Sequence, residues 1–203
     1  MTDLMGKRAV FLDKDGTLVV DVAYNVDPAR LTLTPRAGEA LRLLQDLGYE
    51  LVVVSNQSGI ARGLFSERAL DAVRAKLDDL LGAYGVRLTE SVYCPHHPDG
   101  SVGAYAVACR CRKPEPGLLR GAASRHDIDL HRSWMIGDIL DDVEAGRRAG
   151  CATILVNAGG ETEWALTPSR CPDYVVCDLW VAAQTIAGAD GIRARADLQR
   201  AVL

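Results

Sequence analysis

The sequence predicts an α/β fold, a Rossmann-like sandwich of three layers in which helices cover both faces of a central parallel sheet. Short, almost entirely apolar segments recur along the chain, and such segments are typical of strands buried on both faces. Segments with apolar residues at helical spacing lie between them, as expected for helical crossovers between parallel strands. Because the 203 residues contain no repeat or recognisable linker, we expect a single domain over residues 1–203.

Strands and helices are expected to alternate along the chain. The predicted strands are residues 9–12, 51–54, 86–93, 134–136, 153–156 and 174–176. Four helices are predicted: residues 35–47, residues 66–84 with Ser66 as the N-cap, residues 116–126, and residues 141–149. The first stops at Gly48 and the last ends at Gly150. A helical tail is expected over about residues 188–203.

Composition and charge exclude several classes of protein. The net charge of −4 provides no basic patch for nucleic acid and no polybasic membrane anchor. No apolar run approaches the roughly 20 residues of a membrane span, and the N-terminus lacks the apolar region of a signal peptide. We therefore expect a cytoplasmic protein, a monomer, whose six cysteines do not form disulfides.

Polar residues follow four of the predicted strands. They are residues 13–17, residues 55–59, a Cys/His segment that ends at residues 111–114, and Gly137-Asp138. Ligands of parallel sheets bind at the carboxyl ends of the strands, so these residues should converge. Four polar strand ends are difficult to explain as unrelated surface turns, and they predict one active site.

The residue types fit the hydrolysis of a phosphate monoester. Asp13 can attack the phosphorus as a nucleophile, and Asp15, two residues on, can act as the acid and base. Ser55 and Lys113 can hold the phosphate oxygens. A carboxylate repels a phosphate dianion, so a cation is needed between them. We expect Mg²⁺, held by Asp13, the backbone carbonyl of Asp15, and Asp138.

The segment from residue 94 to residue 111 predicts a second metal site. Cys94, Cys109 and Cys111, with either His96 or His97, supply three thiolates and one imidazole, which complete a closed tetrahedral Zn²⁺ site. Such a site has no open position, so its role would be structural, to pin a long loop. The alternative is a reduced cluster without metal.

Four segments carry a resemblance to the haloacid dehalogenase superfamily: FLDKDGTLV, SNQSG, Lys113 and GDILDD, in that order. The resemblance implies that Asp13 is the nucleophile, Asp15 the acid and base, Ser55 and Lys113 the phosphate-binding groups, and Asp138 the metal ligand. Asp15 and Thr17 resemble the phosphatase branch rather than the dehalogenases. Asp141 or Asp142 could be a second acid of the last motif, but a solvated first helical turn is the favoured interpretation.

A narrower resemblance rests on CPHHPDG, CRCRKPEPGLL and SNQSGIARG, which look like the D-glycero-D-manno-heptose 1,7-bisphosphate 7-phosphatases. It implies removal of the 7-phosphate from a small sugar bisphosphate, no large cap domain, and Cys94, His96, Cys109 and Cys111 as the zinc ligands. It also implies a substrate pocket lined by Asp21, Tyr24, Ser55, Asn56, Gln57, Ser58, Arg112 and Lys113.

Other interpretations stay open at this stage. Histidinol-phosphate phosphatases share the zinc loop, although the long insert at residues 98–108 favours the heptose enzyme. A non-catalytic, zinc-stabilised binding module is opposed by the intact catalytic set. Ile139 departs from the Lys that the heptose family often has there, which leaves the anomer open. Arg62 is either a contact for a second phosphate or a surface arginine.

Overall fold

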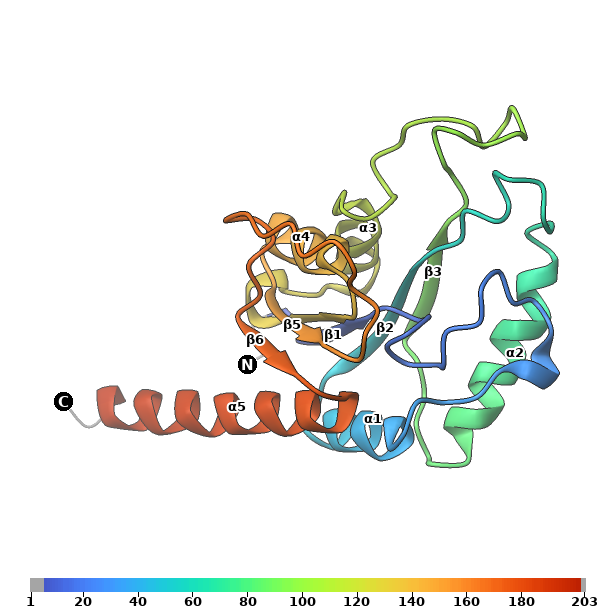
Figure 1. Cartoon of the computed structure of the whole chain (residues 1–203). Helices are drawn as coiled ribbons and strands as arrows, with labels where there is room; N and C mark the ends of the chain where they lie inside the picture. Colours follow the sequence, from blue (N-terminus) through green and yellow to red (C-terminus); the bar gives the residue numbers. More distant parts are fainter. Residues whose placement is uncertain (1–5, 202–203) are drawn as a thin grey trace.

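The computed structural model describes the backbone of residues 6–201 and the side chains of residues 6–191 (Figure 1). The ends of the predicted 1–203 domain, residues 1–5 and 202–203, lie outside the described residues, and so does the last part of the predicted tail. Six parallel strands form one sheet in the order β3-β2-β1-β4-β5-β6. The predicted α/β class with a central parallel sheet is therefore confirmed.

The strands are short and lie close to their predicted positions. They are β1 Ala9–Leu12, β2 Glu50–Asn56, β3 Glu90–Cys94, β4 Trp134–Gly137, β5 Ala152–Val156 and β6 Tyr174–Val176. The helices are α1 Ala37–Asp46, α2 Ala69–Gly82, α3 Gly117–His126, α4 Leu140–Ala149 and α5 Leu179–Ala201, with short 3-10 turns at Pro28–Arg30 and Leu130–Arg132.

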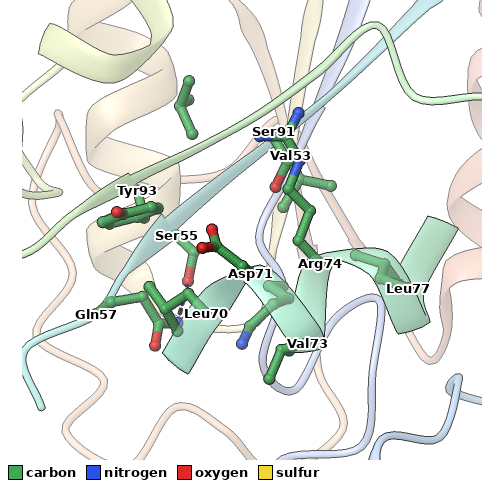
Figure 2. Close-up of a pocket in the computed structure, with 12 residues that line it drawn as sticks. Val53, Ser55, Gln57, Leu70, Asp71, Val73, Arg74, Leu77, Ser91 and Tyr93 are labelled. Atoms are coloured by element: carbon green, nitrogen blue, oxygen red, sulfur yellow. Dashed lines mark hydrogen bonds between the residues drawn. The ribbon is translucent and has the colours of Figure 1, made fainter. Parts of the chain in front are cut away.

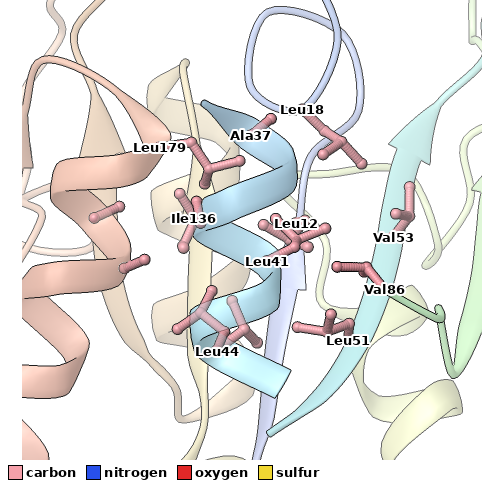
Figure 3. Close-up of a cluster of buried hydrophobic side chains, with 14 of the residues drawn as sticks. Leu12, Leu18, Ala37, Leu41, Leu44, Leu51, Val53, Val86, Ile136 and Leu179 are labelled. Carbon is pink, nitrogen blue, oxygen red and sulfur yellow. The ribbon is translucent and has the colours of Figure 1, made fainter. Parts of the chain in front are cut away.

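Alternation along the strands divides the core into two layers. Val10 and Leu12 of β1 point into the cluster formed with α1, α2 and α5, whereas Ala9 and Phe11 point into the cluster formed with α3 and α4. The first and larger cluster is seen in Figure 3, where Leu41 and Leu44 of α1 pack against β1 and β2. Both faces of the central strands are thus removed from water, which explains their apolar sequences.

Two predicted boundaries on either side of α2 are wrong. The third strand begins at Glu90 rather than residue 86, because residues 83–89 form the turn after α2, in which Val86 packs into the core. Helix α2 begins at Ala69, and Ser66 does not cap it with its side chain. The loop before α2 is instead held by Glu67, whose carboxylate accepts hydrogen bonds from the Tyr93 and Tyr105 hydroxyls.

The C-terminal helix starts earlier than the predicted tail. Helix α5 begins at Leu179, and its first turns pack Leu179, Ala182 and Ile186 into the core beside α1. An ion pair between Arg8 and Asp190 ties it to the start of β1, while its later turns extend past the sheet (Figure 1). Among the described residues no helix is long and apolar enough to cross a membrane.

Candidate active site

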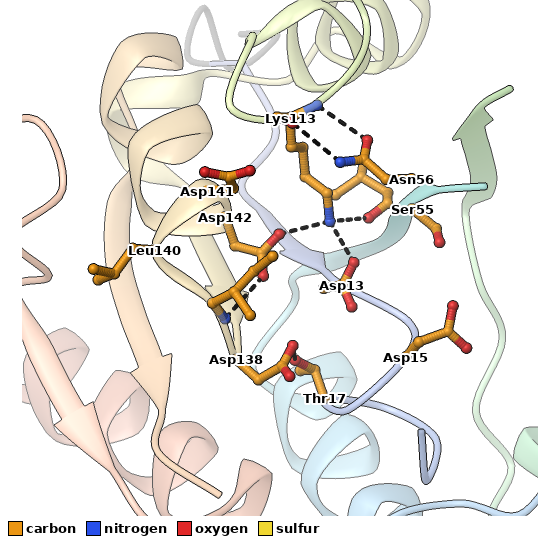
Figure 4. Close-up of polar contacts among 12 residues, drawn as sticks. Asp13, Asp15, Thr17, Ser55, Asn56, Lys113, Asp138, Leu140, Asp141 and Asp142 are labelled. Atoms are coloured by element: carbon orange, nitrogen blue, oxygen red, sulfur yellow. Dashed lines mark hydrogen bonds and ion pairs between the residues drawn. The ribbon is translucent and has the colours of Figure 1, made fainter. Parts of the chain in front are cut away.

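Three aspartates meet at the carboxyl end of the sheet. Asp13 directly follows β1, Asp138 directly follows β4, and Asp142 lies in the first turn of α4 (Figure 4). All three are buried, and one carboxylate oxygen from each lies within 4.8 Å of the others. The backbone N–H of Asp13 donates to the Ile136 carbonyl at 2.9 Å, which continues the sheet pairing and fixes Asp13 beside β4.

Glycines make room for Asp138. A Cβ on Gly16 would lie 2.2 Å from Asp138 Oδ2, and a Cβ on Gly160 would lie 2.0 Å from the same atom. Gly16 also has a φ of +85°, in the left-handed region that favours glycine. The Thr17 hydroxyl donates to Asp138 Oδ1 at 3.2 Å. The loop after β1 is thereby fitted closely around the carboxyl group of Asp138.

Lys113 joins the aspartates from the loop that precedes α3. Its Nζ is buried, forms ion pairs with Asp13 and, at 2.7 Å, with Asp142, and donates to the Val54 carbonyl at 2.9 Å. The backbone of Lys113 is held by the side-chain amide of Asn56, which accepts from the Lys113 N–H at 3.0 Å and donates to its carbonyl at 3.1 Å. We call Asp13, Asp138, Asp142 and Lys113 the carboxylate cluster.

The favoured interpretation of Asp142 as a solvated residue is wrong. Its side chain is fully buried, pairs with Lys113, and accepts a hydrogen bond from the Ile139 N–H at 3.3 Å. The reason is the two-residue connection between β4 and α4, which places the first turn of the helix over the sheet edge. Asp141, one position earlier, is partly exposed and pairs with Arg170 instead. The short connection in GDILDD was the signal that could have identified Asp142.

The carboxylate cluster is short of positive charge. Burial raises the pKa of Asp13 well above its usual value, an effect opposed by Lys113 and reinforced by Asp142 and Asp138. Burial, followed by the charge of Asp142, raises the pKa of Asp138 to about 7. Burial disfavours the charged form of Lys113, but Asp13 and Asp142 raise its pKa. Three buried carboxylates thus share a single ammonium group, and this oxygen-rich set fits a hard divalent cation such as Mg²⁺.

Asp15 and Ser55 lie beside this cluster and are linked by Gln57. The Gln57 Nε2 group donates to Asp15 Oδ2 at 3.0 Å and to Ser55 Oγ at 2.8 Å. The Asp15 carboxylate points away from Lys113 (Figure 4). Asp15 thus lies in the same loop as Asp13, but its side chain makes a separate set of contacts.

A cavity of about 290 Å³ opens in front of Asp15. Its lining includes five residues predicted to contact substrate, namely Asp21, Tyr24, Asn56, Gln57 and Ser58. Arg112 does not line this cavity, because its backbone N–H donates to Cys109 Sγ at 3.3 Å and its guanidinium reaches the His96 carbonyl. A second hollow of about 370 Å³ shares Tyr24 with the first and is lined by Arg62, Leu64, Asp99 and Ser101.

Four further ligand-type side chains meet at the end of β3. We call them the thiolate cluster: Cys94, His96, Cys109 and Cys111. Their three sulfur atoms lie 3.2–3.5 Å apart, and His96 Nδ1 lies 3.4 Å from Cys111 Sγ and 3.6 Å from Cys94 Sγ. Three sulfurs and one imidazole nitrogen grouped in this way fit a tetrahedral Zn²⁺. His97 lies outside the cluster, with Nε2 3.2 Å from Arg62 Nη2.

The fold and the carboxylate cluster define a hydrolase of the HAD-like class. The HAD-hydrolase-like family model matches residues 110–182 of the chain. A HAD-like phosphatase from Mesorhizobium loti matches with a TM-score of 0.78 and 38% identity, over 90% of this chain and 88% of the other. The chain is a phosphoric monoester hydrolase, as the names of its relatives also indicate.

Relatives with higher sequence identity place the chain in a narrower family. D-glycero-beta-D-manno-heptose-1,7-bisphosphate 7-phosphatase from Haemophilus ducreyi is 46% identical over 157 residues, which are 76% of this chain and 86% of the relative. The Escherichia coli K12 protein of the same name is 42% identical, over 74% of this chain and 80% of the relative. The chain belongs to this family of heptose bisphosphate phosphatases.

A solved member of the family carries ligands. The D,D-heptose 1,7-bisphosphate phosphatase from B. bronchiseptica, solved with magnesium and phosphate, matches with a TM-score of 0.74 and 32% identity. The match covers 90% of this chain and 99% of that chain. The resemblance inferred from the sequence motifs is therefore confirmed.

Proposed function

We propose that this chain removes the 7-phosphate of D-glycero-D-manno-heptose 1,7-bisphosphate and releases heptose 1-phosphate. The observation that carries the proposal is the carboxylate cluster, in which two strand-end aspartates and a buried lysine converge beside a cavity. Relatives 41–46% identical to the chain carry this activity in their names, and those names specify the beta anomer. We extend both the activity and the preference for the beta anomer to this chain.

Asp13 is the proposed nucleophile. Its position at the end of β1 is fixed by the backbone, and Lys113 pairs with its Oδ1. The other carboxylate oxygen would attack phosphorus, the bond from phosphorus to the sugar oxygen would break, and Asp15 would protonate that oxygen. Water would then attack the aspartyl phosphate and pass a proton to Asp15. Asp13 would be regenerated as phosphate leaves.

Mg²⁺ is the proposed catalytic cofactor. When bound, it would neutralise the charge of the phosphate dianion beside the carboxylates. The side chains of Asp13 and Asp138 and the backbone carbonyl of Asp15 would hold it, with Asp142 fixing Lys113. Ser55 and Lys113 would bind the oxygens of the transferred phosphoryl group. The family relative solved with magnesium and phosphate supports the presence of both groups in such a site.

The second phosphate of the substrate needs its own contacts. We propose that it lies toward the second hollow, where Arg62 provides a charge and Tyr24 separates the two spaces. Arg112 follows directly after the thiolate cluster and would add a second guanidinium. Asp21, Asn56, Gln57 and Ser58 would line the sugar side of the cavity, although the Asn56 amide is already used by the Lys113 backbone.

The remaining parts of the proposal concern the setting of the enzyme. We propose that the thiolate cluster binds a structural Zn²⁺, because its four donors are grouped at suitable distances. We also propose that the chain forms one domain and acts as a cytoplasmic monomer on a small sugar phosphate, without nucleic acid or membrane.

A phosphate-release screen with Mg²⁺ tests the proposed function. Its substrates are both anomers of the heptose 1,7-bisphosphate, the corresponding 1-phosphate, and histidinol phosphate. We expect rapid release of one phosphate from the beta bisphosphate and slow release from the 1-phosphate. A clear preference for histidinol phosphate would overturn the assignment of the sugar while leaving the phosphatase chemistry intact.

A further inference from the structure

The carboxylate of Asp15 is held on both of its oxygens. Gln57 Nε2 donates to Oδ2 at 3.0 Å, and Lys14 Nζ lies 3.2 Å from Oδ1. Gln57 and Lys14 are themselves buried, with 7% and 8% of their surface exposed. Both oxygens of the proposed acid and base therefore have donors whose own motion is restricted by the surrounding protein.

Gln57 is anchored at three points. Its Nε2 group also donates to Ser55 Oγ at 2.8 Å, a contact that can be followed in Figure 2. Its backbone N–H donates to the Cys94 carbonyl at 2.8 Å, and its carbonyl accepts from the Ile60 N–H at 3.3 Å. The end of β2 is thus fastened to the end of β3, and the amide group of Gln57 is aimed at Asp15 by backbone contacts.

Gln57 and Lys14 lie between Asp15 and the interior of the protein, on the side away from the proposed substrate. Gln57 and Lys14 line both the 290 Å³ cavity and a smaller cavity of about 60 Å³ beneath α2, whereas Asp15 lines only the larger one. Gln57 and Lys14 therefore form the partition between the two spaces. The Asp15 carboxyl is presented from this partition toward the space where the leaving oxygen of the substrate would lie.

The chemistry of an amide suits this role. A glutamine amide does not ionise near neutral pH, so it can hold a carboxyl in both of its protonation states without taking its proton. Asp15 needs both states, because it gives a proton to the sugar oxygen in the first step and takes one from water in the second. An orienting group that titrated near neutral pH, such as a histidine, would compete for that proton.

We propose that Gln57, with Lys14 as a second donor, is a positioning residue that holds Asp15 in line with the leaving oxygen. This inference rests on the proposed phosphatase function and deepens it. Gln57 acts through Asp15 and so affects the proton-transfer steps, while the attack by Asp13 depends on other side chains.

The test is a double-mutant cycle with Gln57→Met, which keeps the side-chain volume but removes the donor, and Asp15→Asn. General acid–base catalysis contributes roughly 10²–10⁴-fold, so losing its alignment should lower kcat by about 10–100-fold. We expect KM for the bisphosphate to stay within about threefold. In the Asp15→Asn background, Gln57→Met should cost almost nothing further, because the group it positions is gone.

Two more variants control the experiment. Gln45→Met removes another glutamine with two side-chain hydrogen bonds, to Gly85 and Arg87, far from the site, and should leave kcat unchanged. Lys14→Met removes the other donor to Asp15 and should lower kcat in the same manner, which keeps the proposal testable if Gln57→Met fails to fold. Thermal melting checks the fold of each variant.

Three results would overturn the inference. Unchanged kcat in folded Gln57→Met, or unchanged kcat in Lys14→Met where Gln57→Met does not fold, removes its basis. A cost of Gln57→Met that persists in full with Asn at position 15 shows an action that does not pass through Asp15. An inactive wild-type enzyme on every phosphate monoester instead rejects the proposed function on which the inference rests.

Discussion

The carboxylate cluster and the thiolate cluster lie at neighbouring strand ends but are held in place by different means. The carboxylate cluster draws on β1, β4, α4 and the loop before α3, and every member is buried. The thiolate cluster draws on the end of β3 and its following loop, and only Cys94 is buried. None of residues 95–112 is buried.

This difference implies that a bound metal would play a different role in each cluster. The sheet already positions the carboxylates, so a metal there would balance charge rather than create structure. The loop of residues 95–112 contributes nothing to the apolar core, so a metal there would supply the cross-link that the loop otherwise lacks. Losing the first metal should remove chemistry and keep the fold, whereas losing the second should loosen the fold around the substrate.

Replacement of Asp13 by Asn should produce the largest effect. The variant lacks the nucleophilic carboxylate, so we expect phosphate release to fall by ~10⁴-fold or more while circular dichroism and melting stay close to those of the wild type. Asp46→Asn, which alters an exposed ion pair with Arg42, is the matched control. Activity of Asp13→Asn within tenfold of the wild type would refute the nucleophile assignment.

Asp142→Asn should produce the next largest loss. The substitution removes an ionised partner of Lys113, a charged contact worth about 1.5–3 kcal/mol, so kcat should fall by roughly 10–100-fold at saturating Mg²⁺.

Its neighbour provides the control. Asp141→Asn changes a carboxylate that faces Arg170 and should keep kcat within about threefold. Equal losses in the two variants would mean that the buried position of Asp142 has no special role in the reaction.

Cys109→Ala tests the thiolate cluster. We expect loss of bound zinc together with about 3 kcal/mol of stability, which in a chain of this size lowers Tm by roughly 6–12 °C. Zinc is measured by elemental analysis and stability by thermal melting. Cys171→Ala, at an exposed cysteine outside the cluster, is the control, and unchanged zinc in Cys109→Ala would show that the ligand set is wrong.

The smallest expected effect concerns the pH dependence of the hydrogen bonds that join the loop of residues 95–112 to the segment before α2. Hydrogen bonds from Tyr105 and then Tyr93 lower the pKa of Glu67 below its usual 4.5. A lowered folded-state pKa stabilises the fold above pH 4.5, and that contribution is lost as pH falls through the folded-state pKa.

Tyr105→Phe should therefore lower Tm by a few degrees at pH 7, and the difference from the wild type should shrink as the pH drops below about 4.5. Melting curves of both proteins across pH 3.5–7 give the comparison. A difference that is constant over this range would remove the role assigned to the Glu67 carboxylate.

Local pattern was sufficient to predict the sheet. Segments such as Ala9–Leu12 are apolar throughout because both faces are covered, and polar residues mark where each one ends. The start of α2 was not predictable, because Glu67 is held there by tyrosines from β3 and from the loop of residues 95–112. Val86 was assigned to a strand because an apolar residue in a turn can also pack into the core.

The site residues likewise divide into those that the sequence could predict and those that it could not. Asp13 and Asp138 could be grouped from the sequence because each follows a parallel strand directly. The contacts of Asn56 and Gln57 with residues 113 and 15 depend on loops distant in sequence. No periodicity records such contacts, so they required the assembled fold.

The most direct test of the account is phosphate release from the heptose bisphosphate as Mg²⁺ is titrated into enzyme whose zinc content is measured and held constant. We predict no turnover without a divalent cation, saturable activation by Mg²⁺, and the same melting behaviour at both ends of the titration apart from the stabilisation due to binding. Turnover that persists after complete removal of Mg²⁺, with zinc still bound, would contradict the assignment of the carboxylate cluster as the catalytic centre.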